Sequence, residues 1–248
     1  MKNAPLDYLT LGRTRIAATG VAAVFGTTGT GKTSRVVLPL LSQFGNTLAC
    51  AAPALYLSAH PADSSYEAGQ VVLRAPRPEH GGGREDTEWQ DFAVDALIQF
   101  AHSTEVYRAL AVDAEILAFL GEDGAGALTG AINSASGSVS KFILVTAPSV
   151  RMLPASVRAA LEKAANTRVF FTIVDIDTME LVRTTVFPRR FWLPRRIHPR
   201  DLRTNGRYAD AIVETEIGKE KESHFMRLTG VRKSGTVEAA AHMQHFSQ

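Results

Sequence analysis

Apolar residues along the chain alternate between short continuous runs and repeats at helical spacing. The run over residues 20–25 ends in a glycine turn and predicts a buried parallel strand. Residues 32–44 place apolar side chains on one helical face, and Pro39 within them is expected to kink that helix or end it early. Further along, helical spacing at 91–100 and 156–165 alternates with β-rich runs at 142–146 and 169–174. This alternation is typical of a parallel sheet covered by helices.

Two polar stretches interrupt this pattern. Residues 61–88 are rich in Pro, Gly, Asp and Arg and are expected to form a surface connection around one strand at 70–74. Arginines dominate beyond Phe187, which predicts a three-layer α/β domain over 1–187 and a basic arm with a small C-terminal appendage over 188–248. For the polar final part, from Glu214 onward, the alternatives are a small hairpin, a docking arm and a partly disordered tail.

Composition narrows the class of protein without naming a partner. The chain has 248 residues, 45% of them hydrophobic, which suits one large α/β domain. A formal charge of +2 means that any nucleic-acid contact has to come from a local patch. The single cysteine, Cys50, and a start without a long apolar core favour the reducing cytoplasm. Polar residues and prolines break the most apolar window, so no membrane span is expected.

The sequence Gly-Thr-Thr-Gly-Thr-Gly-Lys-Thr directly after the first predicted strand matches a phosphate-binding loop. Its glycines allow the backbone to curl so that N–H groups surround phosphates, and the following helix directs its positive end at the anion. Lys32 is expected to reach the β- and γ-phosphates of ATP, and the Thr33 hydroxyl to coordinate Mg²⁺. A glycine turn that binds nothing is the alternative. The candidate nucleotide-binding residues are Gly26, Thr27, Thr28, Gly29, Thr30, Gly31, Lys32, Thr33 and Ser34.

Hydrolysis of a nucleotide needs acidic groups near this loop, and one apolar run offers two. Asp113 ends the run that starts at residue 106, and Glu115 would lie on the same side if the chain stayed extended. Asp113 is then a candidate ligand in the magnesium shell and Glu115 a candidate catalytic acid. The alternative is one amphipathic helix over 104–120 with exposed acids. Thr146, at the end of another predicted strand, either senses the γ-phosphate or caps the turn before Pro148.

The order of these parts resembles the motor domain of the conjugative-transfer and type IV secretion ATPases, relatives of the HerA and FtsK DNA pumps. The resemblance covers about residues 20–174 and implies a RecA-like P-loop NTPase fold. It also implies the roles given above for Lys32, Thr33, Asp113, Glu115 and Thr146. Ala114 separates the two acids, where the family usually has them adjacent, and Ala147 stands where the family has glutamine. The large amino-terminal domain common in the secretion ATPases is not expected, because the loop already begins at Gly26.

The arginine-rich arm offers a candidate contact with single-stranded or double-stranded DNA. Phe191 and Trp192 lie among its arginines, and a strand-binding groove combines positive charge with rings. An arginine finger for a neighbouring subunit and a solvated arm packed on the domain are the alternatives, and Arg151 and Arg168 are further finger candidates. The DNA-contact candidates are Arg189, Arg190, Arg195 and Arg196.

Together these features predict a motor-type ATPase that couples ATP turnover to transfer of DNA or protein. The resemblance implies a homo-oligomeric ring that works with membrane-associated secretion machinery, in the cytoplasm or peripherally at the inner membrane. One alternative is a nucleotide-gated scaffold that binds ATP and hydrolyses it poorly. A small P-loop kinase is another, although the 61–88 connection carries few arginines for a lid.

Overall fold

The computed structural model describes residues 7–45, 54–58, 70–74, 84–102, 108–185, 202–205, 207–217 and 220–229. The strands are β1 (Tyr8–Leu11), β2 (Thr14–Ala17), β3 (Gly20–Phe25), β4 (Ala54–Ser58), β5 (Gln70–Arg74), β6 (Ala109–Asp113), β7 (Phe142–Ala147), β8 (Ala165–Phe170), β9 (Tyr208–Ile217) and β10 (Glu220–Thr229). The helices are α1 (Leu38–Gly45), α2 (Arg84–His102), α3 (Leu117–Ser136), α4 (Ala155–Ala164) and α5 (Ile176–Thr185). Three short helical turns, η1 (Thr33–Val37), η3 (Ala114–Ile116) and η4 (Val150–Met152), complete the elements used below.

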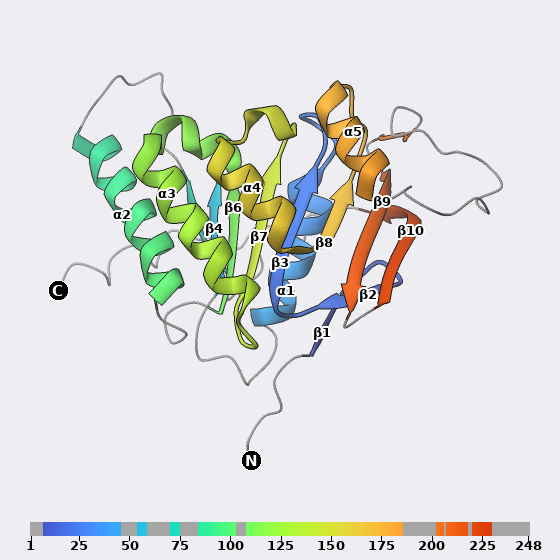
Figure 1. Cartoon of the computed structure of the whole chain (residues 1–248), viewed down its shortest axis with the longest axis horizontal. Helices are drawn as coiled ribbons and strands as arrows, with labels where there is room; N and C mark the ends of the chain where they lie inside the picture. Colours follow the sequence, from blue (N-terminus) through green and yellow to red (C-terminus); the bar gives the residue numbers. More distant parts are fainter. Residues whose placement is uncertain are drawn as a thin grey trace, which may run out of the picture.

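Eight strands form one mixed sheet in the order β10-β9-β8-β3-β7-β6-β4-β5 (Figure 1). The six strands from β8 to β5 run parallel, and β9 and β10 extend the sheet antiparallel to their neighbours. β1 and β2 form a separate hairpin. The expected three-layer α/β class with a mainly parallel sheet is confirmed.

Helices cover both faces of the sheet, so its central strands are buried on both sides. Every residue of β3, β6 and β7 is buried, as their continuous apolar runs predict. The helices from α2 to α5 pack on the face turned toward the viewer, and α1 with the β1–β2 hairpin packs on the other (Figure 1). The sequence of α2 explains its packing on the sheet, because apolar side chains at helical spacing form one buried stripe: Ala93, Ala96, Leu97 and Phe100.

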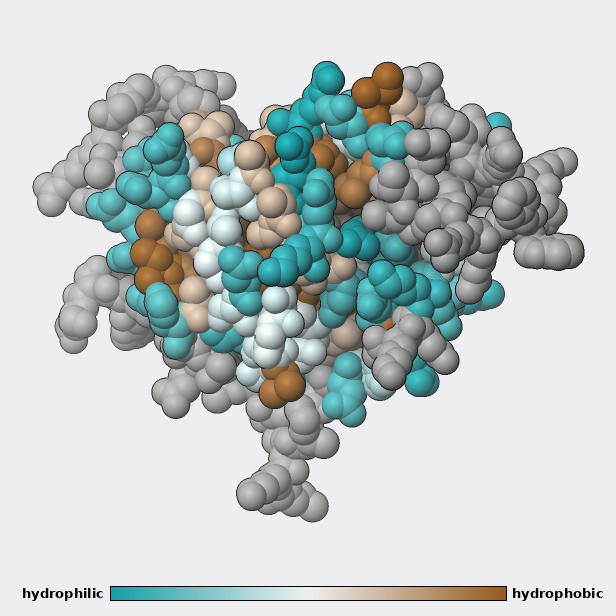
Figure 2. Space-filling model, in the orientation of Figure 1, coloured by the Kyte–Doolittle hydropathy of each residue, from teal (hydrophilic) through white to brown (hydrophobic). Residues whose placement is uncertain are grey.

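The outer surface of these helices is mixed in character. Figure 2 shows teal hydrophilic areas over much of the helix-covered face and a brown apolar area over α2 and α3. Phe92 and Ile98 of α2 belong to the exposed apolar side chains. None of the described helices is long and apolar enough to cross a membrane.

Most predicted elements are found, with corrections at their ends. The run at 169–174 does not form a strand of its own, because the strand is β8, which ends at Phe170. Pro39 does not end its helix: the chain makes the π-helical turn η1, in which the Leu38 N–H donates to the Thr33 carbonyl, and continues as α1. Proline has no backbone N–H to donate, and the wider π-helical turn lets the helix continue past it. The helix weighed for 104–120 is wrong, since β6 occupies its centre.

The C-terminal part joins the sheet. Of the three alternatives for the part from Glu214 onward, the hairpin is observed over the described residues, as β9 and β10, and it begins before Glu214, while residues 230–248 lie outside the described part. Ala209, Ala211, Val213 and Leu228 add to the core beneath the β1–β2 hairpin. The expected domain boundary after residue 187 lies outside the described residues, as do the four arginines proposed to contact DNA.

Candidate nucleotide site

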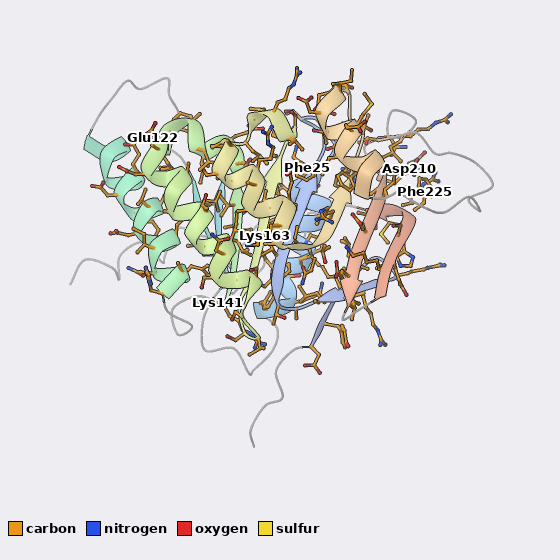
Figure 3. The ribbon with its side chains drawn as sticks, in the orientation of Figure 1. Phe25, Glu122, Lys141, Lys163, Asp210 and Phe225 are labelled. Carbon is orange, nitrogen blue, oxygen red and sulfur yellow. The ribbon has the colours of Figure 1, made fainter. Side chains whose placement is uncertain are left out.

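The phosphate-binding loop connects β3 to η1 at the end of the sheet toward which the parallel strands point (Figure 1). Two backbone hydrogen bonds anchor it: the Gly26 N–H donates to the Ala147 carbonyl at 3.2 Å, and the Thr27 N–H to the Thr172 carbonyl at 3.1 Å. The loop is therefore tied to the ends of β7 and β8. Figure 3 marks its root at Phe25, the last residue of β3.

The curved backbone of this loop requires glycine at three positions. Gly29 and Gly31 have φ of +83° and +82°, a region that L side chains rarely adopt. Gly26 is needed for space, because a Cβ there would lie 2.7 Å from the Cβ of Phe171. Thr30 closes the turn from within, since its buried hydroxyl donates to the Thr27 carbonyl at 2.8 Å. This backbone fits a polyphosphate, whose binding requires N–H groups that converge on one point.

Lys32 extends back across the loop. Its ammonium group donates to the Gly26 carbonyl at 2.7 Å and to the Thr27 carbonyl at 3.4 Å. Burial lowers the pKa of Lys32, and the carboxylates of Asp113 and Glu115 act in the opposite direction. The two candidate acids therefore lie close enough to the lysine to act on its charge.

The acids reach the loop from two strands away. Asp113 ends β6 opposite Thr146 of β7, and Thr146 lies opposite Val24 of β3. The strand β7 therefore lies between β3, which leads into the phosphate-binding loop, and β6. Asp113 and Thr146 are both buried. The structure thus places Lys32, Asp113 and Thr146 at the same end of adjoining strands.

The expected position of Glu115 needs correction. The chain does not stay extended after β6 but turns into η3, because the Asp113 carboxylate accepts the Glu115 N–H at 3.3 Å and caps that turn. Glu115 is half-buried on this turn. Its carboxylate still acts on Lys32, from a turn and not from a strand.

A buried tyrosine that the sequence analysis missed contacts the expected magnesium ligand. The hydroxyl of Tyr56, on β4, lies 3.2 Å from the Thr33 Oγ1 atom, and the tyrosine is fully buried. A buried tyrosine hydroxyl usually finds a hydrogen-bond partner, so a tyrosine within the apolar run of β4 was the available signal. The Thr33 hydroxyl and the Asp113 carboxylate are oxygen ligands of the kind that Mg²⁺ prefers. Three or more His, Cys, Asp or Glu side chains do not cluster as a separate metal site anywhere in the described part of the chain.

Arg35 was also missed. It follows the loop inside η1, is 7% exposed, and donates to the Thr30 carbonyl at 3.2 Å and to the Asn205 carbonyl at 2.7 Å. Burial lowers the pKa of its guanidinium. A cation directly behind the phosphate loop is thereby held by two main-chain oxygens.

The other arginine candidates are placed differently. Arg168 lies on β8, where its guanidinium donates to the Glu214 carboxylate at 3.3 Å and to the Glu162 carbonyl at 3.1 Å. Arg151 is exposed on η4 and pairs with Asp177. Contacts within the chain therefore engage both side chains.

A hollow of about 850 Å³ lies away from the loop, between the β1–β2 hairpin and the β9–β10 hairpin. Tyr8, Arg13, Arg15, Glu222 and His224 belong to its lining. Phe225, labelled together with Asp210 on the β9–β10 hairpin in Figure 3, also belongs to this lining. None of the residues predicted to bind nucleotide lines it.

Comparison with known proteins gives structural neighbours only. No protein-family model matches the chain, and no curated protein does. A structure of Thermomonospora curvata EccC (ATPases 2 and 3) in complex with a signal sequence peptide is similar with a TM-score of 0.50 and 15% identity, covering 92% of this chain and 41% of that one. The cytoplasmic domain of the T. curvata type VII secretion ATPase EccC gives 0.51 and 13%, covering 92% and 28%.

A third neighbour, EssC (ATPases 2 and 3) from Geobacillus thermodenitrificans, has a TM-score of 0.44 and 14% identity and covers 85% of this chain and 39% of that one, too distant to support an argument. The chain spans less than half the length of each of these neighbours. At such identities the likeness concerns the fold alone. That fold is an α/β P-loop NTPase fold of the kind found in secretion-system ATPases.

Proposed function

We propose that this chain is a motor-type ATPase domain that binds ATP with Mg²⁺ and couples its hydrolysis to transfer of DNA or protein. The observation that carries the proposal is the placement of the Lys32 loop, Asp113 and Thr146 at the same end of the neighbouring strands β3, β6 and β7. A glycine turn without a function would not need a buried ammonium group and two carboxylates at the end of the same sheet. The proposal is further supported by the positive φ angles of Gly29 and Gly31.

In this proposal the backbone N–H groups of the loop bind the β- and γ-phosphates, and the Lys32 ammonium moves from the Gly26 carbonyl to the γ-phosphate. The Thr33 hydroxyl and the Asp113 carboxylate would hold Mg²⁺, which neutralises charge on the phosphate oxygens. Glu115 accepts the proton of the attacking water as the bond from water oxygen to γ-phosphorus forms. The bond to the β–γ bridging oxygen breaks, and ADP and phosphate leave.

A nucleotide-gated scaffold is the second candidate function, and one observation favours it. Glu115 lies on a turn that Asp113 itself caps, so one Asp113 oxygen is engaged by the Glu115 N–H. Ala147, buried after Thr146, has no polar side chain to align a water. A site of this kind would bind ATP and hydrolyse it slowly.

For the transported molecule we propose only a chemical class, protein or DNA. The neighbours with the higher TM-scores are secretion ATPases, and one was solved with a signal sequence peptide, which supports a protein as the transported molecule. The arginine-rich stretch around residues 189–196 supports DNA as the alternative. A ring of identical subunits, at work in the cytoplasm or peripherally at the inner membrane with secretion machinery, belongs to the same proposal.

The test compares ATP turnover by the wild type, Lys32→Ala and Lys163→Ala, each with and without single-stranded DNA. Lys163 is exposed on α4 and serves as the matched control (Figure 3). We expect Lys32→Ala to lose about 100-fold or more of the turnover, the scale for removing one group that stabilises the transition state. Lys163→Ala should match the wild type. Equal, low turnover in all three proteins would refute the motor function, and tight ATP binding without turnover would support the scaffold.

A further inference from the structure

Arg35 joins two parts of the chain that lie far apart in sequence. Its Nη1 atom donates to the Thr30 carbonyl, inside the phosphate loop, and its Nη2 atom donates to the Asn205 carbonyl, 170 residues away. Hydrogen bonds from a charged donor are stronger than neutral ones, and they fix the planar guanidinium in one orientation. The loop and the segment of residues 202–205 are therefore held by the same rigid group.

The bond to Thr30 also orients the loop for phosphate. The Thr30–Gly31 peptide is planar and trans, so its carbonyl and the Gly31 N–H point in opposite directions. With the carbonyl directed at Arg35, the N–H points away from Arg35. When that N–H donates to a phosphate, the peptide is polarised, and the carbonyl accepts more strongly from Arg35.

Residues 202–205, which we call the strap, have a second link to the loop. The Thr172 hydroxyl donates to the Leu202 carbonyl at 2.8 Å, and the Thr172 carbonyl accepts the Thr27 N–H at 3.1 Å. Thr172 thus links the loop and the strap through Thr27 and Leu202.

The strap in turn is bound to the start of β9. The Asn205 side chain accepts the Arg207 and Tyr208 N–H groups at 2.8 and 2.9 Å, and the Asp210 N–H donates to the Arg203 carbonyl at 2.7 Å. A change in the order of the strap is therefore transmitted directly to the β9–β10 hairpin at the edge of the sheet.

We propose that Arg35 is a positioning residue that directs the Gly31 N–H at bound phosphate and couples occupancy of the loop to the strap and the β9–β10 hairpin. This inference rests on the proposed nucleotide binding. The coupling is reciprocal: phosphate strengthens the bond from Arg35 to Thr30, and an ordered strap, by fixing Arg35, raises phosphate affinity by the same factor.

The first experiment measures binding of inorganic pyrophosphate and of ATP to the wild type, Arg35→Met, Arg35→Lys and Thr172→Val. Pyrophosphate has no base or ribose, so it reports on the loop alone. We expect Arg35→Met to weaken both ligands about 10-fold, within the 5- to 150-fold range of coupling between two sites. Arg35→Lys, which can reach one acceptor but not both, should recover part of the loss. Thr172→Val removes only the other link to the strap, at Leu202, and keeps both Arg35 hydrogen bonds, so it should weaken the ligands less than Arg35→Met does.

The second experiment needs no variant and uses the full chain. Hydrogen exchange of the wild type is compared with and without MgATP, and with pyrophosphate. Both ligands should slow exchange at residues 207–210, while α2, which the Arg35 contacts do not reach, stays unchanged. Unchanged affinity in Arg35→Met, or a wild type that binds ATP without added protection at 207–210, overturns this inference and leaves the proposed function standing. A wild type that binds neither ligand overturns both.

Discussion

Alanine in place of Gly31 should destabilise the protein more than alanine in place of Gly29. The two glycines have nearly the same φ, +82° and +83°, so the backbone strain of a side chain is similar at both positions. Their surroundings differ. A Cβ on Gly29 meets no atom within 4 Å, whereas a Cβ on Gly31 would overlap the Nη1 atom of Arg35.

The difference in the free energy of unfolding between the two variants follows from the hydrogen bond that Arg35 loses. Backbone strain at positive φ costs about 1–2 kcal/mol in either variant. Arg35 is buried, and moving its Nη1 atom breaks the hydrogen bond to the Thr30 carbonyl. A hydrogen bond that involves a charged group contributes about 1.5–3 kcal/mol. We therefore expect Gly31→Ala to cost at least about 1.5 kcal/mol more than Gly29→Ala, or about 3–6 °C in Tm for a domain of this size.

Denaturant and thermal unfolding of both variants, each made also in an Arg35→Met background, measure this difference. Methionine removes the atom that the new Cβ would strike, so the cost of Gly31→Ala should fall to that of Gly29→Ala in this background. Equal costs for the two alanines in the otherwise wild-type chain would refute the reasoning. So would a Gly31→Ala cost that stays the same when Arg35 is methionine.

Tyr56→Phe removes the hydroxyl beside Thr33 and should raise the Mg²⁺ concentration for half-maximal nucleotide binding roughly 10-fold. A Mg²⁺ titration checks this, and nucleotide binding without Mg²⁺ should not change. Because burial lowers the pKa of Lys32 and Asp113 opposes that effect, Asp113→Asn should lower this pKa further. In Mg²⁺-free buffer the alkaline loss of nucleotide binding then moves to lower pH, and superimposable pH profiles would contradict this. Lys141, which directly precedes β7 and is buried against the C-terminal end of α2, donates to the Phe100 and Ala101 carbonyls, so Lys141→Met should cost about 1.5–3 kcal/mol in denaturant unfolding without weakening nucleotide binding. Burial lowers the pKa of Lys141, so between that lowered pKa and 10.5 the unfolded chain binds more protons. The stability of the wild type relative to Lys141→Met therefore rises with pH in this window.

Local signals in the sequence were sufficient for the loop and its strand. The loop motif lies within eight consecutive residues, and the apolar run before it matches β3 at both ends. Asp113 and Thr146 could be proposed because each ends an apolar run, and parallel strands bring such ends to the same edge of a sheet. The turn at Glu115 could not, because it depends on a side chain, Asp113, that caps the next three residues.

Contacts between distant parts of the chain were beyond sequence reasoning. The contacts of Arg35 could not be predicted, because its acceptor at Asn205 is 170 residues away. The sequence does not distinguish the β9–β10 hairpin from a docking arm or a partly disordered tail, because β10 is an edge strand whose residues 221–223 are all exposed. Polar edge strands carry a weak pattern, since one side has no partner strand.

The central claim is that the loop from Gly26 to Thr33 binds a triphosphate through its backbone and Lys32. Equilibrium binding of MgATP to the wild type and to Lys32→Ala, followed by calorimetry, tests this most directly. The account predicts saturable binding by the wild type, at one site per chain, that is at least about 10-fold weaker in Lys32→Ala, since about 1.4 kcal/mol corresponds to tenfold and a charged hydrogen bond contributes at least that much. Binding of equal strength in both proteins, or no heat of binding in the wild type, would contradict it.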